Sequence, residues 1–158
     1  MSERPVLARR ALAEFLGTGL LVTVVVGSGI AAQQLSSDVG LQLLENSTAT
    51  VFGLAVLILL LGPVSGAHFN PVVSAADAFL GRRTGTGLAG RDLATYIVVQ
   101  VAGGIDGAIL ANLMYQAPTE LSTTERVTAG TLLGEVVATA GLVLLIPTVA
   151  TLYLMLNP

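Results

Sequence analysis

The sequence has 158 residues, of which 53% are hydrophobic and 11% are charged, and its mean hydropathy is +0.82. This composition excludes an ordinary soluble domain and indicates a single compact membrane domain over residues 1–158, with about four spans. The chain has no cysteine, and it shows no Gly-rich phosphate loop, nucleophile triad or metal-ligand cluster. We therefore expect no catalytic residues, no metal and no cofactor, and a membrane enzyme is the weaker class.

The chain begins with a short basic segment, and its cationic residues are unevenly spread. All seven basic residues are arginine, and six of them fall in two patches, which are Arg4, Arg9 and Arg10, then Arg82, Arg83 and Arg91. Because arginine and lysine are retained on the cytoplasmic side, this pattern predicts a multi-pass membrane protein with a cytoplasmic N-terminus. We expect the plasma (inner) membrane as its location. We interpret the patches as topology determinants and expect no nucleic-acid partner.

Four apolar segments are long enough to span the hydrocarbon core. In chain order they cover about residues 11–32, 46–62, 93–115 and 132–156. Glycines recur within these segments, which is typical of helices that pack closely in a bilayer.

The segment Ser65–Val73, which reads SGAHFNPVV, separates the second and third spans. Asn70 followed by Pro71 predicts a helix N-cap with proline at the first helical position, and Gly81 stops that helix. Residues 70–80 then form a helix of roughly 15 Å, half the thickness of a bilayer core. An ordinary capped loop is the alternative. The length instead favours a re-entrant half-helix, with the Gly62–Phe69 link dipping into the membrane and the positive helix end facing its interior.

An internal repeat supports this arrangement. Residues 13–22 and 134–143 agree at four of ten positions, including a Glu-x-x-x-Thr pair that contains Glu14 in one copy and Glu135 in the other. An odd number of spans separates the two copies, so the second enters the membrane with opposite topology, as in transporters built from inverted repeats. The glutamates either brace re-entrant backbone through hydrogen bonds, which we favour, or form a proton relay.

Three sequence features together resemble the aquaporin, or major intrinsic protein, family in its prokaryotic branch. They are the SGAHFNPV motif, the AEFLGT start of the first span, and Gln100-x-x-Gly-Gly-x-x-Gly in the third. The resemblance implies an all-α membrane protein, an aquaporin-like half-fold with four transmembrane helices and one re-entrant half-helix. Residues 11–115 form the first repeat, and 132–156 form the first span of an incomplete second repeat. It also implies a lipid-embedded homo-oligomer, a tetramer in the complete family, that conducts water or small neutral solutes such as glycerol.

The same resemblance assigns roles to individual residues. The Asn70 amide donates to permeating molecules, and the carbonyls of Gly66, Ala67 and His68 line the adjoining half-pore. Pro71 and Val72 complete the pore motif, although Val72 replaces the commoner alanine. The narrow filter takes a residue from the second span, either Thr50 or Phe52.

A second set of residues is expected to brace the loops from behind, and it comprises Glu14, Glu135 and Gln100. Asp106 departs from the family pattern, because a carboxylate within a span is costly unless it is paired or protonated.

The sequence through residue 158 contains one such half-helix, whereas a pore of this type needs two that meet end to end. We therefore expect the 158 residues alone, as a truncated form, not to conduct. One alternative is a non-conducting or degenerate membrane subunit that retains half the fold. A less favoured one is a small membrane enzyme or carrier that uses Glu14, Asp106 and Glu135.

Overall fold

The structure, a computed structural model, describes residues 5–82, 85–120, 123 and 127–156, with side chains placed through residue 144. Arg4, Arg83 and Arg126 lie outside the described residues. The described part of the chain forms five helices, which are α1 (Leu7–Leu35), α2 (Val39–Ser65), α3 (Pro71–Leu80), α4 (Gly90–Met114) and α5 (Ala129–Leu156). The all-α fold class predicted from the sequence is confirmed, and α1, α2 and α4 are each long and apolar enough to cross a membrane.

Helices α1 and α4 share the most extensive contact among the described helices, and glycines remove the side chains at their crossing. A Cβ atom at Gly103 would collide with the carbonyl of Phe15, and one at Gly107 would collide with the carbonyl of Gly19. The Thr23 hydroxyl donates to Gly19 O at 2.8 Å and lies 3.1 Å from Gly107 O, so it bridges the two helices. Close approach and polar bridging of this kind hold helices together where burial away from water cannot.

The second helix runs further than its apolar pattern predicted. Asp38 caps its start by accepting from Leu41 N at 3.0 Å, and the helix continues through Pro63 to Ser65. Proline removes one backbone donor, and a helix in a protein-lined membrane environment can absorb that loss. The link between α2 and α3 is therefore shorter than the Gly62–Phe69 segment expected, and begins at Gly66.

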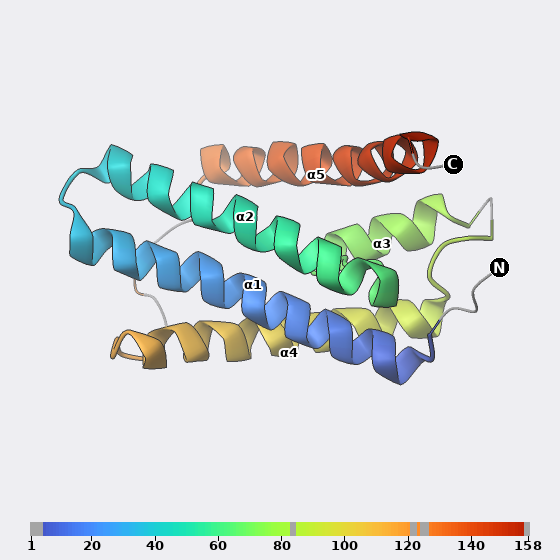
Figure 1. Ribbon diagram of the computed structural model, residues 1–158, viewed down its shortest axis with the longest axis horizontal. Helices are drawn as coiled ribbons and strands as arrows, with labels where there is room; N and C mark the ends of the chain where they lie inside the picture. Colours follow the sequence, from blue (N-terminus) through green and yellow to red (C-terminus); the bar gives the residue numbers. More distant parts are fainter. Residues whose placement is uncertain (1–4, 83–84, 121–122, 124–126, 157–158) are drawn as a thin grey trace.

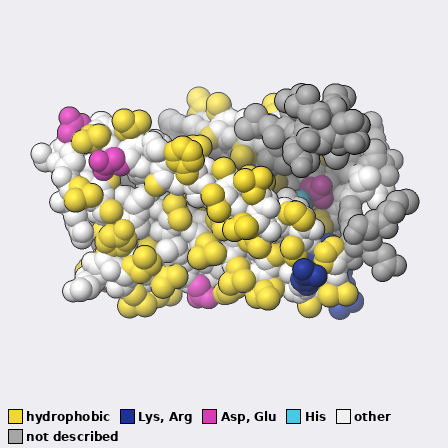
Figure 2. Space-filling view, in the orientation of Figure 1, with side chains coloured by type: hydrophobic (Ala, Val, Ile, Leu, Met, Phe, Trp, Pro, Cys, Tyr) yellow, Lys and Arg dark blue, Asp and Glu magenta, His cyan; other side chains and the backbone are white. Residues whose placement is uncertain are grey.

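The short helix α3 returns toward the end of the molecule at which α2 ends. Figure 1 shows that α1 begins, and α2, α3 and α5 end, at this same end. On the visible face, arginine side chains gather there too (Figure 2). Among the described helices, α5 packs against α3 alone.

Candidate functional site

The segment Gly66–Asn70 joins α2 to α3 with an unusual backbone path. Gly66, Ala67 and Phe69 all have positive φ angles, of 94°, 52° and 48°. For residues other than glycine such angles cost about 1–3 kcal/mol each and persist only where the surroundings enforce them. Part of that enforcement is packing, because Ala67 and Phe69 are buried against Leu57 in an apolar cluster, with the Phe69 ring over Gly17 of α1.

Glu14 holds the segment from behind. Its side chain is fully buried in α1, with 0% exposure. One carboxylate oxygen accepts from His68 N at 3.0 Å, and the other accepts from Phe69 N at 2.8 Å and from Gln100 Nε2 at 2.8 Å. A buried carboxylate is tolerated when its oxygens are filled by donors in this way. Glu14 therefore satisfies two backbone N–H groups that no helix or strand could satisfy.

A polar chain continues from Glu14 to the loop side chain. Gln100, 1% exposed on α4, also donates to the hydroxyl of Ser74 at 2.9 Å. The Ser74 hydroxyl in turn lies 3.1 Å from Nδ1 of His68. Three helices and the loop are thus joined by one buried network.

Tyr96 anchors the other side of the loop. Its ring is fully buried on α4, its hydroxyl donates to Ser65 O at 2.8 Å, and it meets the His68 ring edge-on at 5.5 Å between centroids. Arg10 lies over the same ring and forms a 2.6 Å ion pair with Asp92. The end of α2 and the imidazole are therefore fixed by the same side chain.

These anchors leave one face of the segment free to bind. Asn70 accepts from Val72 N through Oδ1 at 2.8 Å, so its amide NH2 points away from the helix and is available to donate. The carbonyls of Gly66, Ala67 and His68 accept no hydrogen bond from any described residue. The arrangement can therefore offer a row of acceptors followed by a donor to a small polar molecule.

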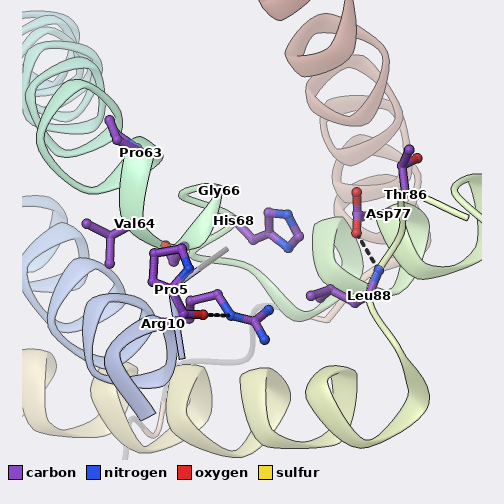
Figure 3. Close-up of a pocket in the computed structure, with 11 residues that line it drawn as sticks. Pro5, Arg10, Pro63, Val64, Gly66, His68, Asp77, Thr86 and Leu88 are labelled. Atoms are coloured by element: carbon purple, nitrogen blue, oxygen red, sulfur yellow. Dashed lines mark hydrogen bonds between the residues drawn. The ribbon is translucent and has the colours of Figure 1, made fainter. Parts of the chain in front are cut away.

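A cavity of about 250 Å³ opens beside this segment, at the end of the molecule that carries the arginines. It is lined by Arg10, Ser65, Gly66, His68, Asp77 and Leu88, among others. Figure 3 shows the His68 ring between Gly66 and Asp77. The Asp77 carboxylate accepts from Leu88 N at 2.9 Å, which holds the 85–88 turn beside the cavity.

Other residues singled out from the sequence lie elsewhere. Glu135 is exposed on α5, with no described loop beside it, and Asp106 is exposed on α4 with no hydrogen bond or ion pair to a described residue. Thr50 is half-buried and Phe52 is 68% exposed, and both lie near the middle of α2, more than ten residues before the loop. Val72 is exposed on the first turn of α3. Their assigned roles stay predictions.

Sequence reasoning missed Ser74, Tyr96 and Asp77 as parts of this site. Ser74 and Asp77 lie within the predicted half-helix, and their polarity in a short apolar helix was an available signal. Tyr96 lies four residues before Gln100, so the two share a helix face. That spacing could have linked it to the loop.

The fold and the loop geometry define a class of protein: an all-helical protein with three described helices long and apolar enough to cross a membrane, in which a buried carboxylate accepts hydrogen bonds from the backbone just before a short helix. A sequence profile of the family described as "Major intrinsic protein" matches residues 1–155. The chain therefore belongs to the major intrinsic protein family, a family of channels rather than enzymes. The resemblance inferred from the motifs is confirmed.

Two relatives illustrate the match. The chain is 50% identical over 138 residues to Aquaglyceroporin AqpS of Rhizobium meliloti, covering 87% of this chain and 57% of that protein. It is 38% identical over 113 residues to a Glycerol uptake facilitator protein of Pseudomonas aeruginosa, covering 72% and 38%. The chain thus spans about half the length, or less, of these relatives. No solved structure matches it significantly.

Proposed function

We propose that the chain builds one half-pore of a channel for water or small neutral solutes such as glycerol. The observation that carries this proposal is the polarity of the Gly66–Asn70 segment, with three carbonyls that accept no hydrogen bond from a described residue and an amide whose oxygen is already used by the helix cap. Such a row replaces the hydration of a neutral solute, while the positive end of α3 disfavours cations.

The half-pore is tested best within a complete channel. We would replace the matching 138-residue segment of the Rhizobium meliloti relative with the corresponding residues of this chain, and measure water and glycerol flux in proteoliposomes. Flux above empty vesicles supports the proposal. A chimaera that inserts and folds but conducts no faster than empty vesicles refutes it.

An Asn70 variant tests the donor within the same chimaera. Asn70→Asp keeps the oxygen that caps α3 but removes the amide donor and adds a charge, so we expect flux to fall sharply while the protein stays folded. The matched control is Asn112→Asp, on α4 near the opposite end, which we expect to leave flux nearly unchanged.

The 158 residues by themselves are proposed not to conduct, because the described part contains one half-helix and none that opposes it. Proteoliposomes that contain only this chain should then match empty vesicles. The glutamate on α5, Glu135, is proposed to brace a second loop, as Glu14 braces the first, and Thr50 or Phe52 to line the filter of the complete channel.

We further propose that the arginine-bearing end faces the cytoplasm, that the protein resides in the plasma (inner) membrane, and that it assembles as a homo-oligomer. The chain has no native cysteine, so single-cysteine variants at Ser37 and Gly85 report topology without background. A membrane-impermeant thiol reagent applied from outside should label residue 37 and spare residue 85. The reverse pattern contradicts the orientation. Crosslinking in native membranes reports the oligomer.

A further inference from the structure

We propose that Ser74 holds His68 in the tautomer that carries its proton on Nε2, which makes His68 a side-chain hydrogen-bond donor toward the cavity beside the loop. The role of that donor toward a permeating molecule rests on the proposed channel function. The tautomer itself follows from the contacts of the buried network.

The argument starts at Gln100, whose amide orientation is fixed by its neighbours. Its Nε2 lies 2.8 Å from a carboxylate oxygen of Glu14 and 2.9 Å from the Ser74 hydroxyl. Turning the amide over would place its oxygen against the carboxylate, acceptor to acceptor. Gln100 therefore donates one hydrogen to each neighbour, and the Ser74 oxygen is an acceptor in this contact.

The single hydrogen of the Ser74 hydroxyl then has one destination. Ser74 is fully buried, and its remaining hydrogen-bond neighbour among the described residues is Nδ1 of His68 at 3.1 Å. A buried hydroxyl that does not donate loses a hydrogen bond that water cannot replace, which destabilises the protein. Ser74 therefore donates to Nδ1, and a neutral imidazole with an acceptor at Nδ1 carries its hydrogen on Nε2.

The ring geometry directs that hydrogen toward the cavity. The Nε2 atom of His68 lies close to Gly66, since a Cβ atom built on Gly66 would be 3.2 Å from Nε2. Nε2 has no hydrogen-bond partner among the described residues. The ring of Tyr96 meets the imidazole edge-on, which restricts its rotation. His68 and Gly66 both line the 250 Å³ cavity, as Figure 3 shows for the imidazole.

This arrangement gives the mouth of the half-pore a donor beside its acceptors. The carbonyls of Gly66, Ala67 and His68, which no described residue donates to, can only accept, so a solute that meets them alone is selected for its hydrogen-bond donors. The His68 donor adds selection for an accepting oxygen. Water and hydroxyl-bearing neutral solutes satisfy both requirements with one group. Ser74 is thus a positioning residue that acts through His68.

The test uses the fact that His68 is the one histidine in the sequence. The 158-residue protein is purified without a histidine tag, labelled with ¹⁵N at histidine, and studied by NMR in lipid nanodiscs near neutral pH. We expect the Nδ1 signal of an unprotonated ring nitrogen and the Nε2 signal of a protonated one. Ser74→Thr should preserve this pattern, and Ser74→Ala should shift population toward the Nδ1–H tautomer.

Two results overturn the tautomer proposal. One is a dominant Nδ1–H form in the unmodified protein, and the other is a Ser74→Ala spectrum identical to that of the unmodified protein. The solute-facing role is tested separately in the conducting chimaera. There His68→Leu should lower glycerol flux about fivefold, as expected for loss of one hydrogen bond, and His68→Gln should retain most of it. Unchanged flux in His68→Leu contradicts that role. A chimaera that never conducts refutes the channel proposal and leaves the NMR result standing.

Discussion

Replacing Glu14 with glutamine tests whether one carboxylate holds the re-entrant loop in place. The substitution keeps size and shape but exchanges one accepting oxygen for an NH2 group. In the native protein both oxygens are used, one by His68 N and the other by Phe69 N and Gln100 Nε2. An amide can satisfy one side only, so at least one buried donor then faces another donor.

The size of the effect follows from that count. Leaving one buried donor unpaired costs about 1–3 kcal/mol, and the relief of burying a neutral group in place of a charge offsets part of it. We therefore expect the free energy of unfolding to fall by about 1–3 kcal/mol. Since the loss is localised, the amides of His68 and Phe69 should exchange with solvent roughly 5- to 140-fold faster.

The assay combines two measurements on protein in detergent micelles. Denaturation followed by far-ultraviolet circular dichroism gives the free energy of unfolding, and hydrogen exchange of the peptide covering residues 66–70 gives the local effect. The matched control is Glu45→Gln on α2, whose carboxylate makes no hydrogen bond or ion pair with a described residue. If Glu14→Gln changes both quantities no more than Glu45→Gln does, the carboxylate does not brace the loop and the reasoning is wrong.

Two further predictions concern the packing around the site. Gly107→Ala places a methyl group against an α1 carbonyl and should lower the free energy of unfolding by about 1–3 kcal/mol. Its control is Gly104→Ala, which should be close to neutral because the nearest side-chain atoms of α1 would lie 3.8 and 3.9 Å from the new methyl group. Equal losses of stability in the same denaturation assay would contradict the crossing geometry. Tyr96→Phe removes the donor to Ser65 O and should cost about 1 kcal/mol and loosen the loop by hydrogen exchange. Tyr115→Phe serves as its control, and loop exchange unchanged in Tyr96→Phe would show that the hydroxyl does not anchor α2.

The sequence predicted structure best where a feature depends on a few consecutive residues of one helix. Asn70 followed by Pro71 specified both the start of α3 and the capping contact, because N-cap and first-turn preferences depend on a few consecutive residues. The glutamate in the first span was predicted to brace the loop because irregular backbone needs hydrogen-bond acceptors, and Glu14 does accept from two loop N–H groups. Apolar length gave the long helices, although capping by Asp38 and the tolerated Pro63 extended α2 beyond its apolar core.

The sequence by itself determined the elements and the kind of site: apolar helices, a half-helix with a polar start, and a carboxylate that had to be satisfied. Only the tertiary structure decided which donors fill that carboxylate, which carbonyls no described residue donates to, and that Tyr96 and Ser74 contact the His68 ring. The reason is that hydrogen bonds between residues 54 or 86 positions apart depend on how helices cross, and close α1–α4 contact at glycines sets that crossing.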